Sequence, residues 1–452
     1  MIATQPHPVL QSSPYRGYVY AYPHKTAYRS LPPRPLREVW ANEDQRHLFL
    51  YIHIPFCTMR CGFCNLFATA QPHRDLVSWY LEALNQHAQA VRNAIPDAHF
   101  ARFAVGGGTP TYLSVAELAQ LFERVKTVMG VDPSAVPTSI ECSPDTLTAE
   151  KVQLFQSWGV ERVSIGIQSF VESETVNCGR PQRRATVDAA LRLLADAQFP
   201  VLNLDLIYGL PGQTVDSWRY SVDEALRYRP QELYLYPLYV RPLTGLGRSR
   251  KDGADLRLAC YRAARDHLLD NGYEQLSMRM FRRRPNPRTQ SDLTSSRNDT
   301  SAKPHYCCQN DGMVGLGCGA RSYTRSLHYS FDYAVQPRGI KSIIADYLSR
   351  RPAELAQAEH GFVLNHDEQK RRYLLQSILN TEGLDIVQYE QRFGSDPSDD
   401  FPDLDIFAEL GLLTFDGHRW QPTALGLERS DAMGPWFFSE QVRQLMAEYV
   451  AQ

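Results

Sequence analysis

The chain has 452 residues, of which 43% are hydrophobic and 22% are charged, and its formal net charge is -2. This balance is typical of a soluble globular protein, and the length exceeds one ordinary core of roughly 150 residues. The small net charge excludes a global attraction to nucleic acid or an anionic membrane, and the sequence has neither a bilayer-spanning apolar run nor a secretory signal, so we expect a cytoplasmic protein.

Residues 1–46 are rich in tyrosine and proline, including Tyr15, Tyr22, Pro32 and Pro33. So many prolines predict an extended arm rather than a domain. The tyrosines favour an arm that docks on the folded body, and a disordered tail is the alternative.

Residues 47–344 alternate short apolar runs with amphipathic stretches, which predicts βαβ units and a parallel sheet. The predicted strands are 48–54, 102–105, 138–142, 162–167, 201–208 and 232–238. The predicted helices are 76–94, 115–129, 149–158, 185–197, 215–228 and 256–271. Six such units fit either a doubly wound sheet or an open, partial (β/α) barrel, and the pattern does not separate the two.

Residues 279–303 interrupt this rhythm with a basic segment that includes Arg279, Arg282 and Arg288. Such a segment is usually a solvated loop. The sharper interpretation is that its arginines bind an anionic group of a substrate.

Residues 345–452 are predicted to form a second, mainly helical domain. Its amphipathic stretches begin just before the boundary and are 340–348, 367–379, 386–393, 404–410 and 438–449. The dipeptide Asp416-Gly417 lies between two short apolar runs and predicts a β-hairpin. Helices followed by a small hairpin resemble a winged-helix domain.

Three of the nine cysteines, Cys57, Cys61 and Cys64, lie within eight residues, directly after the first predicted strand and Pro55. An odd cysteine count argues against a disulfide framework. Soft thiolates suit iron–sulfur clusters and zinc, but a structural zinc site would close with a fourth ligand. Three ligands would leave one iron of a cluster open to a cofactor. Packed structural thiols or an adventitious zinc site are the alternatives.

The second predicted strand runs directly into three glycines, Gly106, Gly107 and Gly108. Glycine lets the backbone approach a ligand closely and exposes its N–H and C=O groups. At the carboxyl edge of the sheet, beside the cysteine loop, this turn suits a backbone cradle for a bound cofactor.

The cysteine spacing CxxxCxxC is similar to the signature of the radical S-adenosylmethionine (SAM) superfamily. Further blocks resemble its oxygen-independent coproporphyrinogen III oxidase-like (HemN/HemW-like) members. These blocks are GGGTPTYL at 106–113, SIGIQSF at 164–170, DLIYGLPGQT at 205–214 and GLGCGARS at 315–322. The resemblance implies a partial (β/α)6 radical-SAM barrel with a helical appendage, a [4Fe–4S] cluster, and one SAM or two.

The resemblance also assigns roles to residues. It makes Cys57, Cys61 and Cys64 the cluster ligands, and Tyr51 and Glu141 candidate catalytic residues. Apart from the resemblance, Cys308 is a further catalytic candidate, as a thiol near the substrate that could donate hydrogen. The implied cofactor-binding residues are Tyr51, Phe63, Gly107, Gly108, Thr109, Glu141, Gln168, Arg180 and Asp205. Arg180 is suited to the methionine carboxylate, and Asp205 or Gln168 to the ribose hydroxyls. Salt bridging inside the barrel is the alternative for these polar residues.

Departures from the family pattern limit the functional prediction. Leu66 stands where true coproporphyrinogen enzymes carry a further cysteine, and Arg321 replaces a histidine of the haem-chaperone branch. Neither porphyrinogen decarboxylation nor haem trafficking is therefore assumed. Members that methylate or cyclopropanate with a second SAM share the same core. A second cluster at Cys307, Cys308 and Cys318 would need a fourth ligand, and buried structural cysteines are more common.

We expect an enzyme that takes an electron from a donor such as flavodoxin or ferredoxin. It would cleave SAM to a 5′-deoxyadenosyl radical and oxidise, methylate or rearrange a small molecule, and the basic segment favours an anionic one. The alternatives are a haem chaperone that keeps the cluster, and a zinc-binding structural protein.

Overall fold

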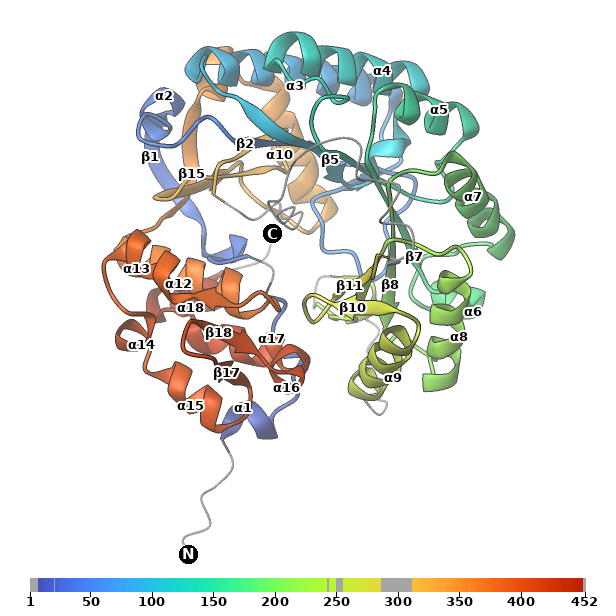
Figure 1. The fold of residues 1–452 in the computed structure, drawn as a ribbon. Coiled ribbons are helices and arrows are strands. Elements are labelled where there is room, and N and C mark those ends of the chain that lie inside the picture. Colours follow the sequence, from blue (N-terminus) through green and yellow to red (C-terminus); the bar gives the residue numbers. More distant parts are fainter. Residues whose placement is uncertain (1–6, 20, 242–243, 249–254, 286–310, 450–452) are drawn as a thin grey trace, which may run out of the picture.

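The computed structural model describes residues 7–19, 21–241, 244–248, 255–285 and 311–449. A curved sheet of thirteen strands forms the main body, with helices around its outer face (Figure 1). Six of these strands are parallel and lie side by side in chain order. They are β2 (Leu48–Ile54), β5 (Phe100–Gly107), β6 (Thr138–Cys142), β7 (Arg162–Gln168), β8 (Val201–Tyr208) and β9 (Glu232–Pro237). Because the strand order never reverses, the winding is that of a partial barrel and not of a doubly wound sheet.

The helices between these strands close the outer face, as their apolar periodicity predicts. They are α3 (Arg74–Ala94), α4 (Val115–Arg124), α5 (Ala149–Ser157), α6 (Glu172–Asn177), α7 (Arg184–Ala197), α8 (Val215–Leu226) and α9 (Arg257–Asp270). Ser114 and Glu117 form a capping box that fixes the start of α4. The helix predicted over 115–129 changes to a π-helical turn (Val125–Met129), and Gly130 ends it with a φ of 69°.

The sheet extends past the six predicted strands on both sides. Next to β2 lie the parallel strand β12 (Met313–Leu316) and then the antiparallel strands β13 (Arg321–Tyr323), β14 (Leu327–Ser330), β15 (Gln357–Val363) and β1 (Arg29–Pro35). Next to β9 lie the antiparallel strands β11 (Met280–Arg283) and β10 (Tyr273–Gln275). All of these strands lie outside the strand–helix rhythm, and all except β1 and β15 are short, so periodicity gave no signal for them.

The prediction of a solvated basic loop at 279–303 is wrong at its start. Met280–Arg283 is strand β11, and Arg279 is buried in an ion pair with Asp431. Arg282 lies 3.6 Å from a carboxylate oxygen of Glu232. These two arginines are therefore held by carboxylates of the chain itself and are not open to a substrate. Residues 286–303 lie outside the described residues.

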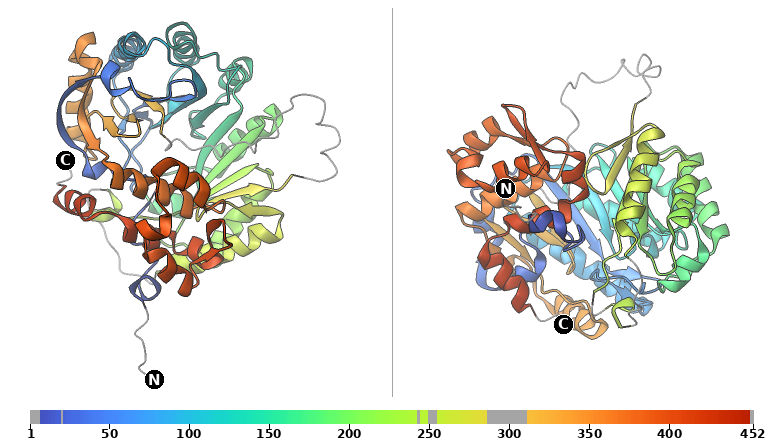
Figure 2. Two further views of the ribbon diagram at one scale, coloured as in Figure 1. Left: turned by 60° about the vertical axis from the view of Figure 1, so that its left-hand side comes forward. Right: turned by 90° about the horizontal axis from the view of Figure 1, so that it is seen from below.

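The arm of residues 7–46 packs on the body and is only partly extended. It contains α1 (Pro8–Gln11), a 3-10 turn (Lys25–Ala27), strand β1 and α2 (Leu36–Val39). Tyr15, Tyr22 and Tyr28 are buried, as a docked arm requires. Figure 2 shows α1 against the C-terminal domain, where His7 contacts Phe407 and Val9 joins the domain core.

The C-terminal part has its own hydrophobic core, but that core begins later than residue 345. Tyr347, Leu355 and Ala358 belong to the barrel core, because α10 (Pro337–Ser349) and α11 (Pro352–Leu355) pack on α3. The second core starts at Phe362. Its helices are α12 (His366–Ile378), α13 (Ile386–Phe393), α14 (Pro397–Asp400), α15 (Asp403–Glu409), α16 (Ala424–Glu428), α17 (Ser430–Met433) and α18 (Glu440–Glu448).

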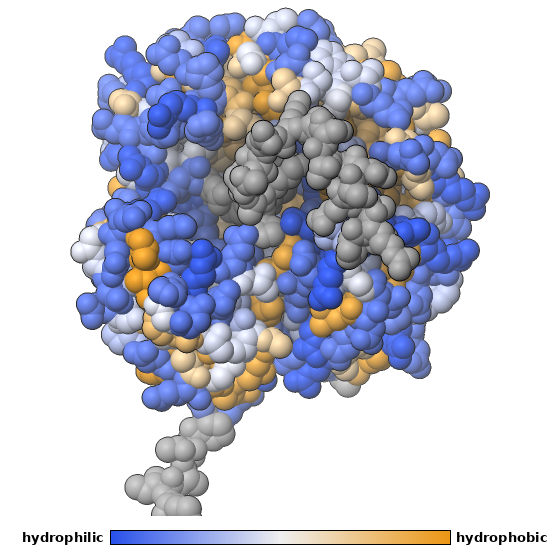
Figure 3. Space-filling view, viewed as in Figure 1, coloured by the Kyte–Doolittle hydropathy of each residue, from blue (hydrophilic) through white to orange (hydrophobic). Residues whose placement is uncertain are grey.

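The hairpin predicted at Asp416-Gly417 is confirmed. It joins β17 (Leu413–Phe415) to β18 (Arg419–Pro422), and β16 (Leu384–Asp385) completes a three-stranded sheet. The face shown in Figure 3 is largely hydrophilic, with scattered apolar residues. Within the described part of the chain, every helix is too short or too polar to cross a membrane.

Candidate active site

The three motif cysteines follow the buried strand β2 and line one cavity of about 320 Å³, here called the cluster cavity. A short parallel pairing of β3 (Phe56–Cys57) with β4 (Thr69–Ala70) holds the start of this loop. Cys57, Cys61 and Cys64 are all half-buried. Among the described residues, no three His, Cys, Asp or Glu side chains could hold one metal ion together. A [4Fe–4S] cluster makes a different demand, because each thiolate binds a separate iron.

Two side chains donate to the cysteine sulfurs. Thr109 Oγ1 lies 3.4 Å from Cys57 Sγ, and Arg180 Nη1 lies 3.4 Å from Cys61 Sγ. Arg180 Nη2 also donates to the carbonyl of Gly166 at 2.8 Å and to Ser143 Oγ at 3.2 Å. Its Nε is buried and has no hydrogen-bond partner among the described residues. Arg180 therefore brings a fixed positive charge to the cluster cavity, and its Nε stays unsatisfied among the described residues.

The three glycines of the second motif are required for space. A Cβ at Gly108 would lie 2.8 Å from the carbonyl oxygen of Phe56 and 2.9 Å from Cys57 Sγ. A Cβ at Gly106 would lie 2.9 Å from the carboxyl group of Glu141. Gly107 has a φ of +116°, and its Cβ would lie 2.8 Å from the ring of His53. The motif therefore packs the cysteine loop, a carboxylate and a histidine closely around one turn.

Two carboxyl groups face the cavity from β6 and β8, the strands on either side of β7. Burial, and secondarily the charge of Asp205, raises the pKa of Glu141 to about 7, although the Gly107 N–H donates to Glu141 Oε2 at 3.1 Å. Burial raises the pKa of Asp205 to about 6, against the hydrogen bond from Asn203 Nδ2 at 2.7 Å. Each carboxyl group is therefore costly to ionise in the free protein and is suited to a cationic or hydroxyl-bearing ligand.

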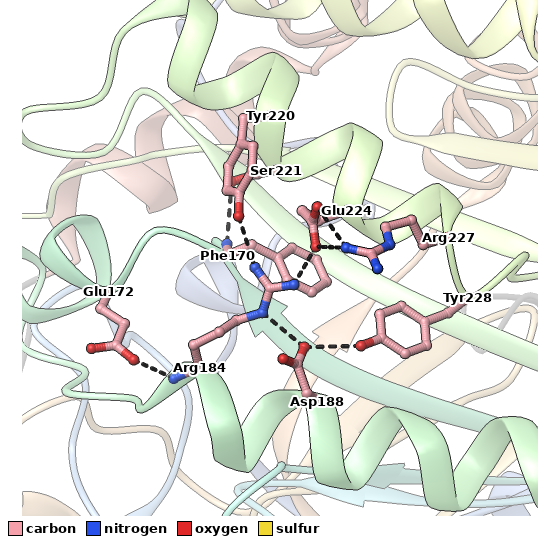
Figure 4. Close-up of polar contacts among 9 residues, drawn as sticks. All are labelled: Phe170, Glu172, Arg184, Asp188, Tyr220, Ser221, Glu224, Arg227 and Tyr228. Atoms are coloured by element: carbon pink, nitrogen blue, oxygen red, sulfur yellow. Dashed lines mark hydrogen bonds and ion pairs between the residues drawn. The ribbon is translucent and has the colours of Figure 1, made fainter.

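The loop that carries Arg180 is anchored by an ion-pair network at the start of α7 (Figure 4). Arg184 Nε donates to Asp188 at 2.7 Å, and the same guanidinium contacts Glu224 on α8. Tyr228 donates to Asp188 at 2.9 Å, and Arg227 lies 3.1 Å from Glu224. The network joins α7 to α8 and so fixes the loop between α6 and α7.

A second cavity of about 440 Å³, here called the barrel cavity, lies next to the cluster cavity. Both are lined by Phe63, Cys64, Leu66, Gly107, Glu141, Gln168 and Asp205. The barrel cavity also receives Tyr51 from β2, Arg321 from β13 and Lys25 from the N-terminal arm. A molecule bound there would therefore lie beside the cysteine loop.

The structure brings most of the predicted site residues together. Gly107, Gly108, Thr109, Glu141, Gln168, Arg180 and Asp205 line the cluster cavity with the three cysteines. Tyr51 lines only the barrel cavity, and Gln168 has an unusual φ of 70°. Cys308 and Cys307 lie outside the described residues. Cys318 is fully buried near Tyr80, so it is a packed cysteine.

Sequence reasoning missed two residues of the site. His53 is buried, and burial lowers its pKa to about 4; its Nε2–H donates to the Phe67 carbonyl at 2.8 Å. His53 follows Tyr51 by two positions on β2, and residues at this spacing share one face of a strand. Strand periodicity could therefore have placed both side chains on the face toward the barrel interior. Lys25 gave no local signal, because only the docking of the arm brings it to the cavity.

Comparisons with known proteins agree with this geometry. Residues 51–225 match the family described as Radical SAM superfamily, and residues 364–428 match the HemN C-terminal domain. The chain is 29% identical to the oxygen-independent coproporphyrinogen III oxidase of Pseudomonas aeruginosa over 417 residues, which cover 87% of this chain and 86% of that protein. It is 26% identical to the heme chaperone HemW of Bacillus subtilis over 378 residues, covering 80% and 92% of the two chains.

The fold is also that of a solved relative. The structure of coproporphyrinogen III oxidase (HemN) from Escherichia coli superposes with a TM-score of 0.75 at 24% identity, covering 92% of this chain and 96% of that chain. The two families' domains occur in the same order as the barrel and the C-terminal domain described above. Residues 51–225 therefore match the radical SAM superfamily, residues 364–428 match the HemN C-terminal domain, and most of the chain is similar to oxygen-independent coproporphyrinogen III oxidase and to HemW.

Proposed function

We propose that this protein is a radical SAM enzyme, with a [4Fe–4S] cluster on Cys57, Cys61 and Cys64 and SAM in the cluster cavity. When bound, these groups supply a 5′-deoxyadenosyl radical. One observation carries the proposal: the three thiols share a cavity with the guanidinium of Arg180, whose Nε has no hydrogen-bond partner among the described residues. A guanidinium held in this way is ready to bind a carboxylate such as that of the methionine part of SAM.

The other residues of the cluster cavity would bind the remaining groups of SAM and the sulfurs of the cluster ligands. Glu141, beside the Gly107 N–H, would accept from the methionine amino group, whose positive charge would stabilise the ionised carboxylate. Asp205 and Gln168, which line the same cavity, would accept from ribose hydroxyls. The backbone of Phe63, which lies between two of the cysteines, is suited to the adenine. Thr109 and Arg180 would donate to thiolate sulfurs and so tune the cluster.

The substrate belongs in the barrel cavity, because this cavity adjoins the cluster cavity and offers both aromatic and charged side chains for binding. Tyr51 lies on its wall and is the candidate catalytic residue there. A 5′-deoxyadenosyl radical could lead to oxidation, methylation or rearrangement of a small molecule in this cavity. In each case an electron donor such as flavodoxin or ferredoxin would first reduce the cluster.

The test is anaerobic reconstitution of the full chain with iron and sulfide, followed by dithionite and SAM. We expect about four irons per chain, and release of 5′-deoxyadenosine. The variant with Cys57, Cys61 and Cys64 all changed to Ala should neither bind iron nor release 5′-deoxyadenosine. Cys260→Ala is the matched control, because Cys260 is buried on α9 away from the cavity. Wild-type protein that holds an intact cluster and SAM but never releases 5′-deoxyadenosine would refute the proposal.

A haem chaperone is the second candidate, and the similarity to HemW along most of both chains favours it. In that case the same cysteines would keep a cluster and the barrel cavity would hold haem. Anaerobic titration with haem separates the two candidates. Stable one-to-one binding without any cleavage of SAM would favour the chaperone, whereas cleavage would favour the enzyme.

A further inference from the structure

A third cavity, here called the back cavity, lies against the opposite face of the sheet from the barrel cavity and has a volume of about 570 Å³. Neighbouring residues of β13 point to the two sides, because Arg321 lines the barrel cavity and Ser322 lines the back cavity. Ser322 pairs with Tyr329 of β14, which also lines the back cavity. The other walls come from β1, β15, α3, α11 and α18. Near the end of β14 the two cavities approach each other and share the lining residues Ala320, Ser330, Phe331 and Asp332.

His87 on α3 brings an unused hydrogen-bond donor to the back cavity. The residue is only 5% exposed, and burial, helped by the charge of Arg350, lowers its pKa to about 3, so the ring is neutral. Its Nδ1 accepts from the Gly317 N–H at 3.2 Å and from the Tyr347 hydroxyl at 3.3 Å, so the ring hydrogen lies on Nε2. Within the described chain no group accepts a hydrogen bond from this Nε2. A buried donor without an acceptor is costly, and an oxygen atom of a ligand would satisfy it.

A second polar side chain of the wall also lacks a partner. Gln357 on β15 is partly buried, and its amide makes no hydrogen bond to any described residue. The two arginines of the wall are, by contrast, already satisfied. Arg350 lies 2.9 Å from both Asp346 and Glu359, and Arg29 donates to three backbone carbonyls at 2.6 to 2.9 Å. The groups left for a ligand are therefore neutral donors and not free cations.

The charges of the wall disfavour an anionic ligand. Three carboxylates line the back cavity, on Asp332, Glu359 and Glu448, against the two occupied arginines. Burial lowers the pKa of His360, so this ring adds little positive charge at neutral pH. A hydroxyl group can donate to a carboxylate and accept from an N–H at the same time. A neutral molecule with several hydroxyl groups therefore matches this wall.

The GLGCGARS block separates the back cavity from the barrel cavity. Its Gly317 has a φ of +95° and donates to His87 on one side, while a Cβ on Gly317 would lie 2.8 Å from the His53 carbonyl oxygen on the other. A Cβ on Gly319 would overlap the His53 ring itself. The glycines thus make a wall one chain thick, which holds His87 toward the back cavity and packs against His53 of the barrel cavity.

We propose that the back cavity is a second ligand site, which takes a neutral sugar. The hydroxyl oxygens of the sugar would accept from His87 Nε2 and from the Gln357 amide, and its hydroxyl hydrogens would be donated to the carboxylates of the wall. The site is separate from the proposed chemistry, since the back cavity and the cluster cavity share no lining residue among the described ones.

The test is a fluorescence titration of the anaerobically reconstituted full chain with three probes that carry one fluorophore. They are methylumbelliferyl glucoside, which is neutral and rich in hydroxyls, the anionic methylumbelliferyl phosphate, and methylumbelliferone methyl ether, which has no hydroxyl. We expect the glucoside to bind about tenfold or more tightly than either of the others, because at least two hydrogen bonds are at stake. His87→Phe should weaken glucoside binding about fivefold to tenfold, and Gln357→Leu about threefold or more. His99→Phe, at an exposed position before β5, is the matched control and should keep the wild-type affinity.

Two further variants of the experiment separate binding in this cavity from other causes. Gln357→Leu decides the matter if His87→Phe fails to fold, because Gln357 is only partly buried and has no hydrogen bond to lose. Asp205→Asn changes a residue that lines both other cavities and should leave the glucoside affinity unchanged. A glucoside that fails to bind, a phosphate or ether that binds as tightly, an unchanged affinity in either folded back-cavity variant, or a loss in Asp205→Asn would overturn the proposal. The titration contains no SAM, so its failure leaves the proposed function untouched.

Discussion

Replacing Asp431 with Ala is expected to loosen the junction between the barrel, the arm and the C-terminal domain. Asp431 is fully buried on α17 and accepts from three separate segments. These donors are the Arg279 guanidinium before β11, the Tyr239 hydroxyl after β9, and the Val19 N–H of the arm at 3.3 Å. The Arg279 guanidinium also lies 4.3 Å from the centre of the Tyr18 ring.

The expected cost follows from the burial of both charges. Burial by itself would lower the pKa of Arg279, but the neighbouring Asp431 carboxylate raises it, so the arginine stays charged. Removing one partner of such a pair leaves an uncompensated buried charge, which typically costs about 3–5 kcal/mol. At about 2 °C per kcal/mol for a large chain, the melting temperature should fall by roughly 6–10 °C.

Calorimetry and urea unfolding of the full-length variants measure this effect. The double variant Arg279→Met with Asp431→Leu should recover most of the loss, because no charge then stays buried. Glu82→Ala removes one partner of the surface pair with Arg124 and should leave the melting temperature nearly unchanged. A fall of less than about 1 °C in Asp431→Ala, or a double variant no more stable than the single one, would refute the reasoning.

Two further predictions concern the cluster cavity. Gly108→Ala should lower the iron content after reconstitution, because its Cβ would meet backbone atoms of Phe56 at 2.8 Å and displace the cysteine loop; Gly17→Ala, which meets only Pro435 at 3.9 Å, should not. The raised pKa of Glu141, about 7 against an ordinary 4.5, means that its contribution to stability is present below pH 4.5 and lost as the pH rises through 7. The melting temperature of metal-free protein should therefore fall between pH 5 and 8 more in the wild type than in Glu141→Gln, and equal slopes would contradict the assigned pKa.

Local sequence determined the strands and helices of the barrel, and it also determined the three thiols and the glycine turn of the candidate site. The bounds of β2, β6 and β8 agree with the predicted runs. For β2 the reason is that a strand buried on both faces is a nearly continuous apolar run, which Pro55 ends. The cysteine spacing and the glycine turn are likewise properties of a few adjacent residues. Their position after strands also predicted that they meet at the carboxyl edge of the sheet.

Only the tertiary structure decided how distant segments meet. Periodicity could not choose between a doubly wound sheet and a barrel, because that depends on strand order and not on any single strand. The same holds for Arg279, whose partner Asp431 lies 152 residues away, and for Lys25, which reaches Arg321 and the neighbourhood of Cys64 only because the arm docks. Such contacts form once long-range packing offsets the entropy of closing long loops, and no local pattern in the sequence encodes that balance.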